Sequence, residues 1–197
     1  GNGFFDEAPN SPFSLGATPT SVFIADTNED GDMDIITTIN KGNEVAILLG
    51  DGNGDFNEDY LSHTVGFDPA SVRVDDINDD DINDIVSANS DSSDVSILLG
   101  TGNGSFREAD RSPLSVGDSP ESLFIEDMNG DGYLDIITAN SESDDVSVLL
   151  GDGNDDYIEV ITSPFGVGQH PYSVFAADVN GDTQPDIVTS NSDSNDV

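Results

Sequence analysis

Asp127-Met-Asn-Gly-Asp-Gly-Tyr-Leu-Asp135 is a nine-residue acidic stretch that lies between the apolar runs Ser122–Ile125 and Leu134–Thr138. The same pattern occurs four times in the 197 residues, always with Asp at positions 1, 5 and 9 and Asn at position 3. The copies are residues 26–34, 76–84, 127–135 and 178–186. Since the residues between these positions vary, the pattern indicates a loop that gathers side-chain oxygen atoms.

The spacing of these oxygens favours a calcium site. Side chains at positions 1, 3 and 5 of a tight loop point to one centre, a backbone carbonyl near position 7 adds an oxygen, and a later carboxylate completes the shell. Calcium accepts six to eight such oxygens in a flexible geometry. An EF-hand places its closing acid at position 12 between two helices. Here the closing Asp is at position 9 and the flanks are β-branched and aromatic, so we predict a turn between two strands.

The four copies are evenly spaced. The first Asp of each loop lies at 26, 76, 127 and 178, which gives steps of 50, 51 and 51. Each repeat reads as four strands: one before the acidic loop, one after it, an apolar strand such as Val146–Leu150, and a weaker strand that ends in Val-Gly. The apolar strand lacks a polar face, which is typical of a sheet covered on both sides. The sequence therefore predicts an all-β propeller of four-stranded antiparallel blades.

This period divides the chain into one propeller region. Residues 1–16 are predicted to be the last strand of a blade, residues 17–66, 67–117 and 118–168 to be three complete repeats, and residues 169–197 to be a partial fourth repeat. The expected architecture is a part of a larger ring, with a small four-bladed ring as the alternative. One aromatic residue per repeat, such as Phe106 or Tyr157, is expected to pack between blades.

The charge of the chain restricts its partners. Forty-one acidic residues oppose four basic ones, so the formal net charge is −37. This charge argues against nucleic acids and anionic membrane surfaces as partners, because phosphate contacts need clustered Lys and Arg. No apolar run approaches the roughly 20 residues of a membrane-spanning helix. The surplus acid is typical of salt-adapted, halophilic surfaces, and the need for abundant free calcium favours a secreted or cell-surface protein.

The acidic loop and the downstream segment Val146-Ser-Val-Leu-Leu-Gly-Asp-Gly-Asn154 resemble the FG-GAP and VCBS-type repeats, which also build the propeller of integrin α-subunits. The resemblance covers essentially the whole chain. It implies up to four Ca²⁺ ions, one per loop, and a role in adhesion or in binding a protein or carbohydrate ligand. The side-chain ligands that it implies are Asp26, Asn28, Asp30, Asp34, Asp76, Asn78, Asp80, Asp84, Asp127, Asn129, Asp131, Asp135, Asp178, Asn180, Asp182 and Asp186. The position-7 carbonyls belong to Asp32, Ile82, Tyr133 and Gln184.

Two loops depart from the family pattern at position 6, where Asp81 and Thr183 replace glycine. A positive φ at this position would strain both residues, so these two sites are expected to be weaker. No recurring catalytic constellation is visible, and we expect a module that is not an enzyme. Two alternatives stay open, namely a propeller scaffold of a polysaccharide-active enzyme and an acidic spacer that binds no specific metal.

Overall fold

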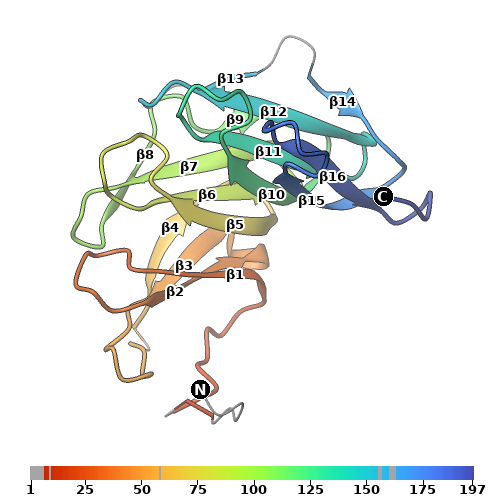
Figure 1. Cartoon of the computed structure of the whole chain (residues 1–197). Coiled ribbons are helices and arrows are strands. Elements are labelled where there is room, and N and C mark those ends of the chain that lie inside the picture. Colours follow the sequence, from red (N-terminus) through yellow and green to blue (C-terminus); the bar gives the residue numbers. More distant parts are fainter. Residues whose placement is uncertain (1–6, 9, 58, 155–156, 160–162) are drawn as a thin grey trace.

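The computed structural model describes residues 7–8, 10–57, 59–154, 157–159 and 163–197. It confirms an all-β propeller architecture of successive antiparallel sheets (Figure 1). The first sheet contains β1 (Pro19–Ala25), β2 (Asp34–Ile39), β3 (Glu44–Leu48) and β4 (Leu61–Thr64). The second contains β5 (Pro69–Asp75), β6 (Asp84–Asn89), β7 (Asp94–Gly100), β8 (Phe106–Glu108) and β9 (Leu114–Ser115).

The other two sheets repeat this plan. The third contains β10 (Pro120–Glu126), β11 (Asp135–Asn140), β12 (Asp145–Gly151), β13 (Tyr157–Glu159) and β14 (Phe165–Gly166). The fourth contains β15 (Pro171–Ala177) and β16 (Asp186–Asn191). The weak outer strand of the second and third sheets is divided in two, since β8 and β9 both pair with β7, and β13 and β14 both pair with β12.

The predicted strand within residues 1–16 is not present in the described residues. Residues 1–6 and 9 lie outside the described part, and residues 7–8 and 10–16 contain no strand. An outer strand is held in place by pairing with the apolar strand of its own blade, and none of the described residues ahead of residue 16 forms such an apolar strand. Phe13 instead packs edge-on against Phe56, with ring centroids 5.2 Å apart. Between β2 and β3 lies the 3₁₀ turn η1 (Asn40–Gly42), and no described helix is long and apolar enough to cross a membrane.

The core lies between consecutive sheets. On β6, the side chain of Ile85 joins the cluster shared with the first sheet, whereas Val86 and Ala88 join the cluster shared with the third. Successive side chains of a strand point to opposite faces, so a strand buried on both faces needs side chains that are apolar or hydrogen-bonded internally. In β6 the buried hydroxyl of Ser87 donates to Asn89 Oδ1 at 2.9 Å. Tyr157 belongs to the second of these clusters, and its hydroxyl donates to the carbonyl of Ile77 in the second sheet at 3.2 Å. This residue therefore packs between blades, as the repeat of aromatic positions predicts.

The first strands of the four sheets follow one another along the inside of the arc. β1 contacts β5, β5 contacts β10, and β10 contacts β15. A serine hydroxyl links each pair. Ser21 accepts a hydrogen bond from the N–H of Val72 at 3.2 Å, and Ser71 and Ser122 accept in the same way from Leu123 and Val174 at 3.3 Å. The junction between neighbouring blades is thus the same structure repeated three times.

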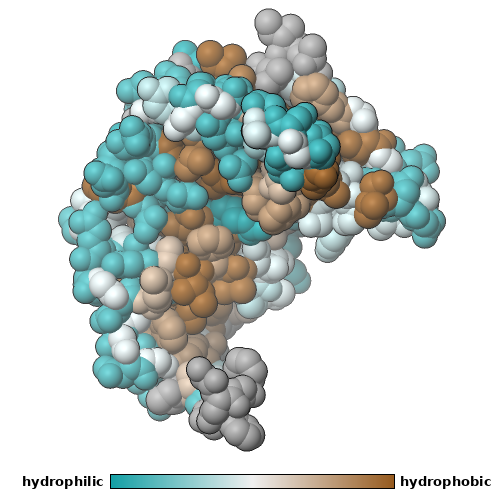
Figure 2. Space-filling view, viewed as in Figure 1, coloured by the Kyte–Doolittle hydropathy of each residue, from teal (hydrophilic) through white to brown (hydrophobic). Residues whose placement is uncertain are grey.

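The first and last sheets each have one uncovered face. Val22 of β1 is 63% exposed, although its equivalent Val72 in β5 is fully buried by the preceding sheet. Phe175 of β15 is 56% exposed, although its equivalent Phe124 packs against it at 4.4 Å. Figure 2 shows hydrophobic side chains gathered over the lower, first sheet. The four sheets therefore form an open arc in which the end faces do not cover each other.

Candidate metal centres in the four acidic loops

Each acidic loop connects the first strand of a sheet to the second. In the third sheet the loop joins β10 to β11, and Asp135 is the first residue of β11, paired with Glu126. Asp34, Asp84 and Asp186 occupy the same register in the other sheets. A short antiparallel connection forces the chain to turn back within the loop, which brings positions 1 to 7 together at one end of the blade.

Within the loop, side-chain oxygens accept hydrogen bonds from backbone N–H groups that point inward. Asp127 accepts from Gly130 at 2.7 Å and from Gly132 at 2.9 Å. Asn129 Oδ1 accepts from the N–H of Asp131 at 2.8 Å, and Asp131 Oδ1 accepts from the N–H of Tyr133 at 2.9 Å. Positions 1, 3 and 5 thus fold the third loop around their own oxygens.

The same network recurs in the other three loops. The carboxylate at position 1 accepts from the N–H at position 6 in every copy, over 2.7–2.9 Å. The carboxylate at position 5 accepts from the N–H at position 7 in every copy, over 2.8–2.9 Å. The second loop differs at position 3, because the N–H of Asp80 donates to Asp76 at 3.0 Å. The four predicted sites therefore share one backbone conformation.

The aspartate at position 9 has a second task that the sequence did not reveal. Asp34, Asp84 and Asp135 are fully buried. In each, Oδ2 accepts from the N–H at position 2 of the loop, and Oδ1 accepts from the glycine that follows or ends the third strand, namely Gly50, Gly100 or Gly151. These carboxylates fasten the loop to the third strand. The equivalent Asp186, whose sheet has no third strand, accepts from the side chain of Asn180 instead.

The electrostatics of the loops reflect this difference in burial. Burial raises the pKa of Asp84 to about 7, against the opposing effect of its N–H donors, and the charges of Asp80 and Asp76 raise it further. The pKa of Asp135 is raised to about 6 for the same reasons. The pKa of the exposed Asp178 is lowered instead, chiefly by the N–H groups of Thr183 and Gly181. The carboxylates of Asp84 and Asp135 are thus under repulsion from the acidic residues at positions 1 and 5 of their loops, which a cation would relieve.

Position 6 has a positive φ in all four loops. The values are 91° for Gly31, 65° for Asp81, 92° for Gly132 and 74° for Thr183. Asp81 and Thr183 therefore adopt a left-handed conformation that is unfavourable for residues with a Cβ.

Position 4 also has a positive φ, which the sequence analysis missed. Glu29 and Asp79 adopt 60° and 61°, and glycine occupies the position as Gly130 and Gly181. The two glycines at this position were the available signal. The third loop is consequently the one with glycine at both positions.

The donors of these loops fit a hard cation such as calcium. All the side-chain donors are carboxylate or amide oxygens, and an oxygen that accepts one hydrogen bond keeps a second lone pair for a metal. Among the described residues, no three Asp, Glu or His side chains are already gathered round a common point. The side chain of Asn129 instead donates to Asp131 Oδ2 at 2.9 Å, as Asn28 does to Asp30. Ligation by Asp32, Ile82, Tyr133 and Gln184 through their carbonyls stays a prediction.

Solved structures with the same architecture resemble the chain at low sequence identity. BBS1N in complex with ARL6DN aligns with a TM-score of 0.55 at 12% identity, over 89% of this chain and 51% of its own. A lectin of Agrocybe aegerita gives 0.55 at 23% identity over 86% and 46%, and the periplasmic gluconolactonase PpgL of Pseudomonas aeruginosa gives 0.57 at 17% over 88% and 43%. The chain thus spans about half the length of these structures.

No curated protein matches the chain. The model of the FG-GAP-like repeat matches twice, over residues 76–138 and 127–189, which together make up more than half of the sequence. The two matches are offset by one repeat, and each begins at the first residue of one acidic loop and ends just after the next acidic loop. The chain therefore belongs to the family of FG-GAP-like repeat proteins.

Proposed function

We propose that the four acidic loops bind calcium and that the chain is a calcium-stabilised, non-catalytic binding module of a secreted or cell-surface protein. The observation that supports this most is the pair of hydrogen bonds that all four loops share despite their differing sequences. The N–H at position 6 donates to the carboxylate at position 1, and the N–H at position 7 donates to the carboxylate at position 5. A neutral side-chain oxygen would also accept the hydrogen bonds made at positions 1, 5 and 9, so turn formation alone does not account for a carboxylate there in every copy. Oxygen ligation of a divalent cation does.

Calcium would act on stability in this proposal. Each loop holds at least three acidic residues in nine, and self-repulsion of this density opposes folding. Four calcium ions would change the formal net charge of −37 to −29, since 4 × 2 = 8. At free calcium about 100-fold above its dissociation constant, each site contributes roughly 2.7 kcal/mol of stability. Four such contributions are comparable to the whole stability of an ordinary domain.

The binding role is supported by the known partners of proteins with this fold. The Agrocybe aegerita lectin recognises non-reducing terminal N-acetylglucosamine, and BBS1N was solved with ARL6DN. Both show that an architecture of this kind can present a surface to a sugar or to a protein. A protein or carbohydrate ligand is therefore the partner that we propose for this module.

Thermal unfolding of the chelator-treated protein tests the calcium assignment. The melting temperature is measured at fixed high salt during separate titrations with calcium and magnesium. We expect a large rise with calcium alone and a smaller one for Asp131→Ala. The matched control is Asp110→Ala, which removes the same charge from an exposed turn outside the loops. Equal responses to the two metals, or to sodium at the same ionic strength, would favour the spacer without specific metal. Turnover of acidic or neutral glycans would favour the enzyme.

A further inference from the structure

A second polar site lies at the opposite end of the strands from the acidic loops. A cavity of about 600 Å³ is formed where the first strands of all four sheets begin. Its volume lies within the roughly 300–1,000 Å³ of small-molecule sites. The lining serines Ser21, Ser71 and Ser122 accept backbone N–H groups, which leaves the hydroxyl hydrogen of each available as a donor.

Arg73 brings a positive charge into this cavity of a very acidic protein. Its guanidinium lies 5.9 Å from the ring centroid of Phe23, and its Nη1 donates to the carbonyl of Val72 at 2.9 Å. Burial lowers the pKa of Arg73, but a guanidinium stays charged at neutral pH. In the part of the chain that the structure describes, Arg73 forms no ion pair. A half-buried cation without a counter-charge favours an anionic group in the cavity.

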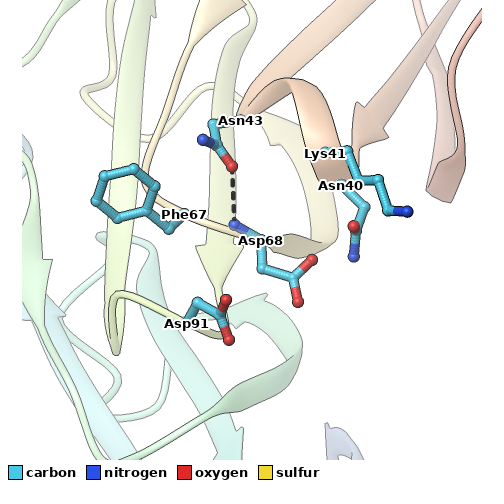
Figure 3. A pocket seen from close by; sticks show the side chains of 6 residues that line it. All are labelled: Asn40, Lys41, Asn43, Phe67, Asp68 and Asp91. Atoms are coloured by element: carbon cyan, nitrogen blue, oxygen red, sulfur yellow. Dashed lines mark hydrogen bonds between the residues drawn. The ribbon is translucent and has the colours of Figure 1, made fainter.

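An adjoining cavity of about 550 Å³ extends the site toward the first sheet (Figure 3). The two cavities share Asn40 and Asp68, and the second also contains Lys41. Figure 3 shows Asp68 in the middle of this second cavity, between Asn43 and Asp91. Two of the four basic residues of the chain therefore line this one region.

Asp68 supplies an acceptor that lacks a donor. Its N–H donates to Asn43 Oδ1 at 3.2 Å, but its own Oδ1 is buried and accepts no hydrogen bond in the structure. A buried carboxylate oxygen without a donor costs free energy that a ligand hydroxyl would recover. Exposed aromatic rings stand beside these polar groups, Phe67 in the second cavity and Tyr172 in the first. Such rings offer apolar faces on which a sugar ring can stack.

We propose that these joined cavities bind a carboxylate-bearing sugar, such as a uronic acid residue of an acidic glycan. The sugar carboxylate would pair with Arg73, its hydroxyls would donate to Asp68 and accept from the serines, and its ring would lie on Tyr172. Glu121, whose pKa is raised by burial, lines the same cavity. Asp68 and Glu121 together would repel a free inorganic anion, whereas a sugar offers hydroxyl donors to both.

Isothermal titration calorimetry with calcium-loaded protein tests the proposal, with the same free calcium and high salt in cell and syringe. The probes are a tetramer of β-1,4-linked glucuronic acid and its neutral counterpart, cellotetraose. We expect the acidic tetramer to bind about tenfold or more tightly than the neutral one, as one charge-assisted contact allows. Equal affinities, or no binding of the acidic tetramer, would overturn the proposal.

Three variants locate the site. Arg73→Met is expected to weaken the acidic tetramer about tenfold and to leave cellotetraose unchanged, while the control Arg107→Met, which removes one positive charge from β8, changes neither. Because Arg73 packs on Phe23 and its loss can disturb folding, Glu121→Gln provides an independent test and is expected to strengthen binding of the acidic tetramer. No gain with Glu121→Gln, together with full binding by a folded Arg73→Met protein, would contradict the assignment.

The test also separates this inference from the calcium proposal. The residues that line the cavity lie near the beginning of the first strands, and the acidic loops follow the ends of the same strands. The two sites therefore share no residue. A wild-type protein with a full calcium-dependent rise in melting temperature but no affinity for the acidic tetramer would refute the sugar site alone.

Discussion

Reciprocal exchange of the residue at position 6 tests whether backbone strain distinguishes the third loop from the fourth. Gly132→Thr places a β-branched residue where φ is 92°, and Thr183→Gly removes one from a φ of 74°. A Cβ on Gly132 would meet nothing within 4 Å, so its cost is that of the backbone alone. The side chain of Thr183 is exposed, so its loss removes little contact.

The expected effects have opposite signs. A left-handed conformation costs a residue with a Cβ about 1–2 kcal/mol. Glycine, by its greater freedom in the unfolded chain, costs roughly 0.5–1 kcal/mol. The difference between these two costs is about 1 kcal/mol, so the stability of the loop should fall by this amount in Gly132→Thr and rise by it in Thr183→Gly. Expressed as calcium affinity of the affected loop, this is about fivefold.

Native-state hydrogen exchange in saturating calcium is the appropriate assay, because it measures β10–β11 and β15–β16 separately, which global unfolding does not. Protection should fall at the third loop in Gly132→Thr and rise at the fourth loop in Thr183→Gly. A loss of protection in both variants would show that Thr183 is not strained. It would also remove the reason to rank the fourth site below the third.

Two further predictions concern the blades themselves. Ser71→Ala leaves the N–H of Leu123 without its acceptor and should lower the free energy of unfolding in urea by about 1–3 kcal/mol. The control Ser173→Ala, at the uncovered end of the arc, should lower it by almost nothing. Equal losses in the two variants would show that the serine links do not stabilise the protein. Burial raises the pKa of Glu121 above its ordinary 4.5, so the contribution of its protonated form to stability is complete below 4.5 and is lost as pH rises through the higher folded value. Glu121→Gln should therefore stabilise the protein at pH 7 and not at low pH, and a constant difference at all pH values would contradict this.

Much of the fold could be predicted from the sequence because the repeat supplies four readings of the same unit. The strand before each acidic loop, the strand after it and the apolar third strand all lie where the sequence places them. An apolar run such as Val146–Leu150 can only be covered on both faces, and the structure places Val146 and Val148 toward the fourth sheet and Leu149 toward the second. The divided outer strands were less predictable, since their few apolar residues carry no clear period.

The sites were predictable only where function depends on residue type. Asp at positions 1, 5 and 9 is visible in the sequence, but the burial of Asp135 and its bond to Gly151 depend on the third strand, 16 residues away. The positive φ at position 4 could not be predicted from the first two loops, because Glu29 and Asp79 occupy the position there and neither is glycine. Arg73 and Asp68 come from one blade, yet the cavity that they line exists only when four first strands converge. Such sites follow from the assembly of repeats and not from any single one.

The serine links between first strands make this architecture modular. Each inner blade offers a hydroxyl to the blade after it and an N–H to the blade before it, at the same register each time. A duplicated repeat would therefore form the same hydrogen bonds with the blades on both sides, and no new type of contact would be needed. Blades can be gained by duplication, or lost by deletion, of one unit of about 50 residues. The contacts between inner blades then stay the same, and only the two end faces of the arc are affected.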